Sequence, residues 1–169
     1  MRSPTLSAGP DDTGCEDRVS DVVAAVLAGA RRRAVRDGDA QIDTAHLLHG
    51  LLESDPDVRD AFPGGSPQVI RLLGYLVQRA IGYGLRWSGS VEDSAVAPPG
   101  RSGMAGWSPA SAAALDAALR RAASRGASRA DGLDLLAALV RDRECRAMEV
   151  LRRAGVAVAP LVTALEGEV

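Results

Sequence analysis

Two segments of this 169-residue chain, residues 20–53 and 108–141, carry the same pattern of residues at a constant offset of 88 positions, without a gap. The matched pairs are Ser20 and Ser108, Leu27 and Leu115, Ala30 and Ala118, Arg32-Arg33-Ala34 and Arg120-Arg121-Ala122, Gly38 and Gly126, Asp43 and Asp131, Leu47-Leu48 and Leu135-Leu136, and Leu51 and Leu139. A repeat of this length predicts one supersecondary unit used twice, with each copy covering the apolar face of the other. We therefore expect a functional site where the two copies meet.

The composition favours helices along the whole chain. Aromatic residues make up only 3% of it, so the core must consist mainly of alanine, leucine and valine. Stretches rich in alanine and leucine favour helix, and no alternating strand pattern is present. One helix is predicted over about residues 21–36, a second begins near Asp43 or Thr44, a short third ends near Phe62, and a fourth begins at a Ser66-Pro67 cap. Four more helices follow the Ser108-Pro109 cap. The expected fold is all-α, with two pseudo-symmetric four-helix repeats.

The chain divides into four predicted segments. Residues 1–17 are poor in large apolar groups and are expected to form a disordered tail. Residues 18–83 form the first repeat, residues 84–106 a linker rich in Gly, Pro and Ser, and residues 107–167 the second repeat. The N-terminus lacks the apolar region of a signal peptide, and no stretch is long and apolar enough to cross a bilayer. These features predict a cytoplasmic protein that does not associate with membranes.

Charge and cysteine content exclude several classes of function. The net charge is −2, so no global field attracts nucleic acid. All 20 basic residues are arginine, which is typical of GC-rich genomes such as those of actinobacteria. Arg31-Arg32-Arg33 is interpreted as a solvated helix face. Cys15 and Cys145 are expected to be free thiols, and neither has a neighbour in sequence that would activate a nucleophile. We predict that the protein is not an enzyme.

Two histidines raise the question of a metal. His46 and His49 lie about one helical turn apart, and Glu53 follows one turn later, which is a spacing that could bind a metal. The chain contains no other histidine, and His46 is more simply a packing and capping residue. The sequence therefore predicts no metal and no cofactor.

Three motifs point to one protein family. Thr44-Ala45-His46-Leu47-Leu48-His49-Gly50-Leu51 resembles the signature of the Clp N-terminal repeat, which reads Thr, Glu, His, Ile or Leu, Leu, any residue, Gly, Leu. Trp107-Ser108-Pro109 resembles the opening of that family's second copy, and residues 141–156 resemble its closing segment. The resemblance covers roughly residues 18–166 and implies the N-terminal domain of the ClpC, ClpA and ClpB unfoldases, a pseudo-twofold pair of four-helix repeats. The family's domain is a docking module for substrates, degrons and adaptor proteins.

The chain has no Gly-x-x-x-x-Gly-Lys-(Ser/Thr) motif, and it contains no lysine at all, so it cannot form a phosphate-binding P-loop. We therefore expect a stand-alone Clp N-terminal-like domain without the ATPase module.

The resemblance also indicates a site and how it has changed. In ClpC, a glutamate after the signature threonine of each copy binds the guanidinium of phosphoarginine. The matching positions here are Ala45 and Leu133, so both charges are lost, and Gly132 and Asp134 replace the threonine and histidine of the second copy. An apolar groove near the first helix of each copy binds cyclic-peptide antibiotics in ClpC. Its matching positions are Val19, Ser20, Trp107, Leu115 and Asp116. Trp107 is either an anchor for a ligand or a plug that seals the linker against the core.

Two functional hypotheses remain. The first is a non-enzymatic module that binds Clp unfoldase or protease components, adaptors or substrate peptides, and acts as an adaptor, a decoy or a regulator. The second is a sequestrant that binds Clp-directed cyclic peptides and so confers resistance to them.

Overall fold

The computed structural model describes residue 15, residues 17–80 and residues 106–167. Within these residues the fold is all-α, with eight helices and no strand, which confirms the predicted fold class. The predicted tail lies almost wholly outside the described residues, as do Trp87 and nearly all of the predicted linker. None of the described helices has the length and hydropathy that a membrane span requires.

The helices of the first copy begin and end where local chemistry predicts. Helix α2 (Asp21–Asp37) begins after Ser20, whose hydroxyl accepts a hydrogen bond from the Val23 N–H. It ends at Gly38, whose φ of 71° lies in the left-handed region that favours glycine. Helix α3 (Thr44–Ser54) is followed by the short α4 (Pro56–Asp60), and Asp55 lies between them. Helix α5 (Gly65–Ala80) begins at Gly65, so Ser66 lies inside its first turn and is not its cap.

The second copy repeats this order. Helix α6 (Pro109–Ser124) begins after Ser108, with proline at its first position as predicted. Helices α7 (Gly132–Arg141), α8 (Arg146–Arg153) and α9 (Val158–Glu166) complete the copy. Helices α2–α5 thus fall within residues 18–83, and α6–α9 within residues 107–167.

Two isolated β-bridges join the copies. Val19 pairs in parallel with Ala130, and Ile42 pairs in parallel with Trp107. The 88-residue offset converts Val19 into Trp107 and Ile42 into Ala130, so each bridge is the repeat equivalent of the other. The Ser20 N–H donates to the Ala130 carbonyl at 2.8 Å, and the Ser108 N–H donates to the Ile42 carbonyl at 3.0 Å. The internal repeat of the sequence therefore corresponds to a pseudo-twofold arrangement in space, in which each copy pairs its two bridge residues with those of the other copy.

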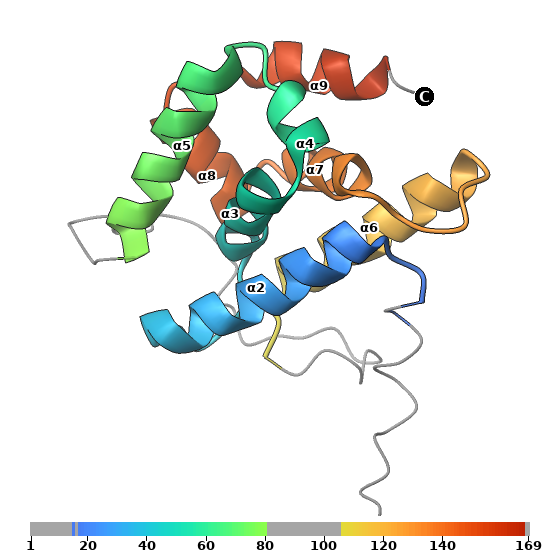
Figure 1. Cartoon of the computed structure of the whole chain (residues 1–169), viewed down its shortest axis with the longest axis horizontal. Helices are drawn as coiled ribbons and strands as arrows, with labels where there is room; N and C mark the ends of the chain where they lie inside the picture. The colour runs from blue at the N-terminus through green and yellow to red at the C-terminus, as the bar shows by residue number, and fades with distance from the viewer. Residues whose placement is uncertain (1–14, 16, 81–105, 168–169) are drawn as a thin grey trace, which may run out of the picture.

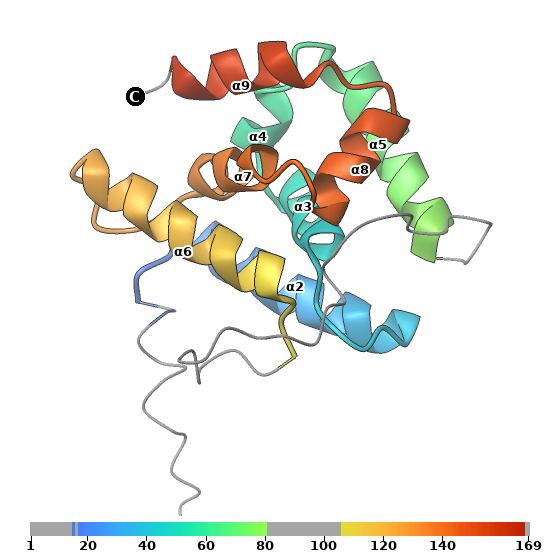
Figure 2. The ribbon, with the colours of Figure 1, turned by 180° about the vertical axis from the view of Figure 1, so that it is seen from behind.

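The equivalent helices α3 and α7 form the centre of the molecule (Figures 1 and 2). Helix α3 is buried at every position from Thr44 to Leu52. Helices α2 and α6 lie on the lower side in Figure 1, α9 lies on the upper side, and α5 and α8 lie beside α3. The core consists mostly of aliphatic side chains, and its largest fully buried members are leucines: Leu47, Leu48, Leu51, Leu52, Leu72, Leu76, Leu135, Leu136, Leu139, Leu151, Leu161 and Leu165.

Candidate functional site

A buried ionic cluster joins the two copies at the start of α3. Asp43 is fully buried, and its Oδ2 accepts hydrogen bonds from Arg79 Nη2 at 2.5 Å and Arg146 Nη1 at 2.9 Å. Arg79 belongs to the end of α5 in the same copy, whereas Arg146 opens α8 of the other copy. Next to Asp43, the Thr44 hydroxyl accepts from the Ala147 N–H at 2.9 Å. These contacts fix the start of α3 against the start of α8.

The protonation of Asp43 is set by these partners. Burial alone would raise the pKa of the Asp43 carboxyl group. The hydrogen bond with His46 and the charges of Arg79 and Arg146 outweigh burial and hold the pKa of Asp43 well below its usual range. Asp43 is therefore a structural anion and not a general base.

The start of α7 carries the equivalent cluster with different residues. Asp43 and Asp131 cap their helices in the same way, each in a reciprocal capping box. The partner inside the box is His46 in the first copy and Asp134 in the second. Arg125 binds both oxygens of the buried Asp134, at 2.5 and 3.1 Å. The hydrogen bonds from Arg125 to Asp134 raise the pKa of Arg125.

The same comparison explains the acidic groups near His46. Asp37, Asp39 and His46 offer ligand atoms within 4.8 Å of one another, which is a geometry that could hold a metal ion. At the 88-residue offset, Arg125 matches Asp37 and Asp134 matches His46. In the second copy, a basic residue at the end of α6 thus pairs with an acidic residue of the α7 capping box. In the first copy the acidic group lies in the loop, and His46 Nε2 lies 2.9 Å from Asp39 Oδ2. Because His46 Nδ1 accepts from the Asp43 N–H, the ring proton is carried by Nε2, on the side of Asp39. A metal would have to displace that proton, so these residues fit a polar contact between His46 and Asp39 better than a metal site.

His49 and Glu53 belong to another cluster, between α2 and α3. His49 Nε2 lies 3.0 Å from Glu53 Oε1, and Arg33 of α2 pairs with Glu53 Oε2. Burial lowers the pKa of His49 to about 4, and the charge of Arg33 adds to the effect. His49 is therefore neutral at pH 7, and the pair of Arg33 with Glu53 ties α3 to α2.

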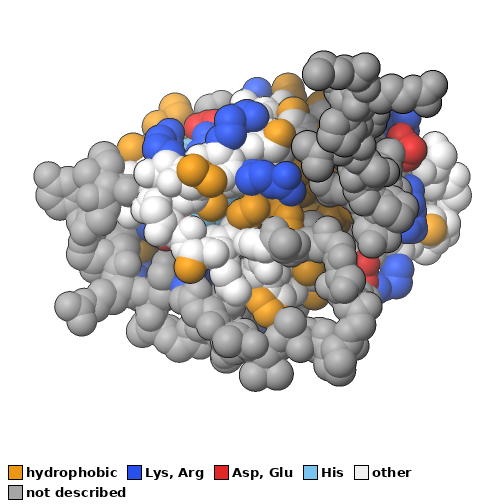
Figure 3. Space-filling model, turned by 90° about the horizontal axis from the view of Figure 1, so that it is seen from below, with side chains coloured by type: hydrophobic (Ala, Val, Ile, Leu, Met, Phe, Trp, Pro, Cys, Tyr) orange, Lys and Arg blue, Asp and Glu red, His pale blue; other side chains and the backbone are white. Residues whose placement is uncertain are grey.

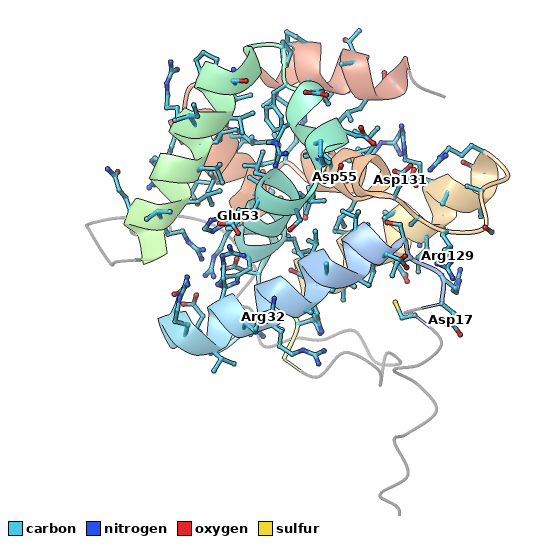
Figure 4. All side chains as sticks on the ribbon, viewed as in Figure 1. Asp17, Arg32, Glu53, Asp55, Arg129 and Asp131 are labelled. Atoms are coloured by element: carbon cyan, nitrogen blue, oxygen red, sulfur yellow. The ribbon has the colours of Figure 1, made fainter. Side chains whose placement is uncertain are left out.

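Gly132 and Asp55 account for the altered signature of the second copy. A Cβ atom at Gly132 would lie 1.8 Å from Asp55 Oδ2, so no other residue fits at the start of α7 without a rearrangement. Asp55 Oδ1 accepts from the Asp57 N–H at 3.0 Å and so caps its own helix, α4 (Figure 4). At the equivalent interface, Cys145 is the N-cap residue of α8 but makes no side-chain cap. Thr44 of the other copy caps α8 in its place, because its hydroxyl accepts a hydrogen bond from the Ala147 N–H. The loss of threonine at position 132 is thus compensated by an aspartate at position 55.

The two positions that the sequence resemblance matches to the phosphoarginine glutamates of ClpC, Ala45 and Leu133, carry no charge. Ala45 is completely buried at the start of α3, and Leu133 is partly buried at the start of α7. Neither side chain can form a hydrogen bond. Asp43 and Asp131, which lie two positions earlier, are occupied as helix caps.

The residues predicted to line a groove lie around the openings of α2 and α6. Val19 and Leu115 are 1% and 2% exposed and belong to the core. Ser20 caps α2, and Asp116 is half-buried and pairs with Arg120 at 3.4 Å. Trp107 is 8% exposed. Its backbone pairs with Ile42, and the Arg31 guanidinium lies 5.9 Å from the centroid of its ring.

Helices α2 and α6 present a common face to solvent, which we call the lower face. Figure 3 shows it with arginine side chains lying among hydrophobic ones. The exposed residues of α2 and α6 are mostly alanine and arginine: Asp21, Val22, Ala25, Ala28, Arg31, Arg32, Val35, Arg36, Ala113, Arg120, Ala123 and Ser124. Figure 4 shows Arg32 on this outer side of α2.

The prediction of one solvated face for Arg31-Arg32-Arg33 does not hold for all three side chains, which differ in their contacts. Arg33 binds Glu53, Arg31 covers Trp107, and Arg32 is exposed. The helical period could have separated Arg33 from its neighbours, because Arg33 lies closest to the buried stripe. It could not have placed Trp107 beside Arg31, because that contact depends on how the copies pack.

The fold is that of a Clp N-terminal domain. The chain is similar to the N-terminal domain of the caseinolytic protease associated chaperone ClpD from Arabidopsis thaliana, with a TM-score of 0.61 and 17% identity over 96% of this chain and 98% of that one. It is also similar to a structure from preliminary investigations of a malarial protein secretion system, with a TM-score of 0.62 and 16% identity over 89% and 94% of the two chains. No protein-family profile and no curated protein matches the sequence. The likeness thus rests on the fold, and identities this low show nothing finer.

Proposed function

We propose that the domain is a non-enzymatic module that binds proteins and peptides of the Clp proteolysis pathway, as an adaptor, a decoy or a regulator of a ClpC-type unfoldase. The observation that carries this proposal is the likeness to the ClpD domain over nearly the whole of both chains. The paired copies, with the buried Asp43 of the first bound by Arg146 of the second, provide a rigid scaffold. A cytoplasmic location is part of the proposal.

The lower face is the proposed contact surface. Its exposed alanines at positions 25, 28 and 113 keep the relief low, so that a partner can approach the backbone of α2 and α6 closely. Trp107 is the proposed anchor at the junction of the copies, and the Arg31 guanidinium lies over its ring. Phosphoarginine is not the proposed ligand, because Ala45 and Leu133 offer no charge.

The test uses the whole chain, immobilised and exposed to a purified ClpC-type unfoldase, its protease and their adaptor proteins. We expect one of these to bind, and we expect Ala28→Arg on the lower face to reduce binding at least tenfold, because the larger charged side chain blocks the surface. Gly74→Arg on α5 is the matched control, since Gly74 faces open space on another side of the molecule. Retention of none of these proteins at micromolar concentration, or equal binding by both variants and the wild type, would contradict the proposal.

A second candidate is sequestration of Clp-directed cyclic peptides, favoured by the arrangement of Trp107, Arg31 and the exposed Val35. A large amphipathic ring could cover such a patch. Titration with such a peptide in a Trp87→Phe background would change the fluorescence of Trp107. A flat titration would exclude this candidate.

A further inference from the structure

We infer that the lower face selects acidic, apolar peptide segments through a patch formed by Arg31, Val35 and Trp107. This inference rests on the proposed function and names the chemistry of its ligand. The partner is a protein segment in which a glutamate or aspartate side chain lies close to a large aliphatic or aromatic one.

The first argument is the state of the arginines. Arg31 and Arg32 are both exposed, and neither forms an ion pair with a residue that the structure describes. By contrast, the nearby Arg33 binds Glu53, and Arg120 lies 3.4 Å from Asp116. Two neighbouring cationic groups on one exposed face attract a carboxylate by charge complementarity.

The second argument is the position of Arg31 over the indole. Its guanidinium lies 5.9 Å from the centroid of Trp107, within the range of a cation–π contact. An arginine stacked on an aromatic ring keeps its in-plane N–H groups available for a bidentate bond to a carboxylate. The contact with the ring therefore restricts the orientation of the guanidinium before a ligand binds, which reduces the conformational entropy that Arg31 loses on binding.

The third argument comes from the repeat. The 88-residue offset places Leu119 where the first copy has Arg31, and Leu119 is only 9% exposed. An aliphatic side chain thus occupies the equivalent position in the other copy, so the shared scaffold does not require an arginine at position 31. The charge at position 31 is an addition to the shared scaffold.

The fourth argument is the apolar neighbour. Val35 lies one helical turn after Arg31 and is 78% exposed, more than any other large aliphatic residue that the structure describes. A ligand that contacts Arg31 through a carboxylate can cover Val35 with an adjacent apolar side chain. The patch therefore combines one charged and one apolar requirement.

The experiment measures fluorescence anisotropy of the whole chain with three labelled decapeptides. The peptides share valine and leucine at the same positions and differ only in carrying glutamate, glutamine or arginine between them. We expect the glutamate peptide to bind about tenfold more tightly than the glutamine peptide, as a charge-assisted hydrogen bond implies. High salt should remove most of that difference.

Arg31→Leu copies the residue of the second repeat and should remove the preference for glutamate, while binding of the glutamine peptide stays. Arg31→Gln is the second variant, in case the leucine alters packing, and Arg71→Gln on α5 is the control that should keep the preference. Equal binding of the glutamate and glutamine peptides, or an unchanged preference in both Arg31 variants, would overturn the inference and leave the proposed function intact. Failure of all three peptides to bind the wild type, together with failure of the Clp components, would overturn both.

Discussion

Asp43 is the residue on which the contact between the copies most depends. Its carboxylate binds Arg79 and Arg146 in a fully buried position. We predict that Asp43→Asn lowers the free energy of unfolding by about 3–5 kcal/mol at pH 7, because removal of one partner leaves buried charge poorly compensated. Urea denaturation followed by circular dichroism measures this loss. Asp116→Asn is the control and should cost less than about 0.5 kcal/mol, since the pair with Arg120 is exposed. A loss below about 1 kcal/mol in Asp43→Asn would refute this account.

His49 gives the molecule a pH dependence that can be calculated in sign. Its pKa is about 4 in the folded protein and about 6.5 in an unfolded chain. Between these values the unfolded state binds the additional proton, so the free energy of unfolding rises with pH. We predict that stability falls as the pH drops from about 6.5 to 4, by up to about 3 kcal/mol. His49→Gln should flatten this part of a series of urea denaturation curves, and an unchanged slope would show that another group is responsible.

Gly132 and Asp55 show how two helix ends share one space, between α7 and α4. Gly132→Thr alone should cost about 2–3 kcal/mol, because the new side chain collides with the Asp55 carboxylate. Asp55→Cys alone should cost about 1 kcal/mol through the lost cap. Together, these changes reproduce the Thr44 and Cys145 pair of the other interface. We predict that the double variant is more stable than the sum of the single effects by about 1–2 kcal/mol. Strictly additive losses in urea denaturation would contradict the equivalence of the two interfaces.

The helices themselves could be predicted because their signals are local. Ser20, Asp43 and Ser108 cap helices at the predicted positions, and Gly38 ends α2. The pairing of Gly132 with Asp55 could not be predicted, since the two residues belong to different copies and their contact depends on packing. The repeat predicted that the copies meet, but not that Asp43 would bind Arg146. Of the predicted groove residues, Val19 and Leu115 could not be told from core by their apolar character alone.

At the scale of the molecule, the two copies are interlocked and not merely adjacent. Each copy contributes one partner to both β-bridges, and Arg146 of the second copy binds Asp43 of the first. The central helices α3 and α7 would each lose part of their cover if the other copy were removed. A unit of this size, below about 80 residues, gains only a few kcal/mol from its own core, so the loss of this cover is a large fraction of its stability.

We therefore predict that neither half of the chain folds alone. Residues 1–95 and residues 96–169, expressed separately, should show low helical circular dichroism and no cooperative unfolding. Mixed in equal amounts, they should recover the helicity of the intact chain and form a one-to-one complex in sedimentation, because the bridges and the Asp43 cluster need no covalent linker. The Asp43→Asn change in the first half should weaken that association, while Asp116→Asn in the second should leave it nearly unchanged. Cooperative unfolding of the isolated second half would contradict this prediction. It would show that each copy folds independently and that the β-bridges only orient two folded domains relative to each other.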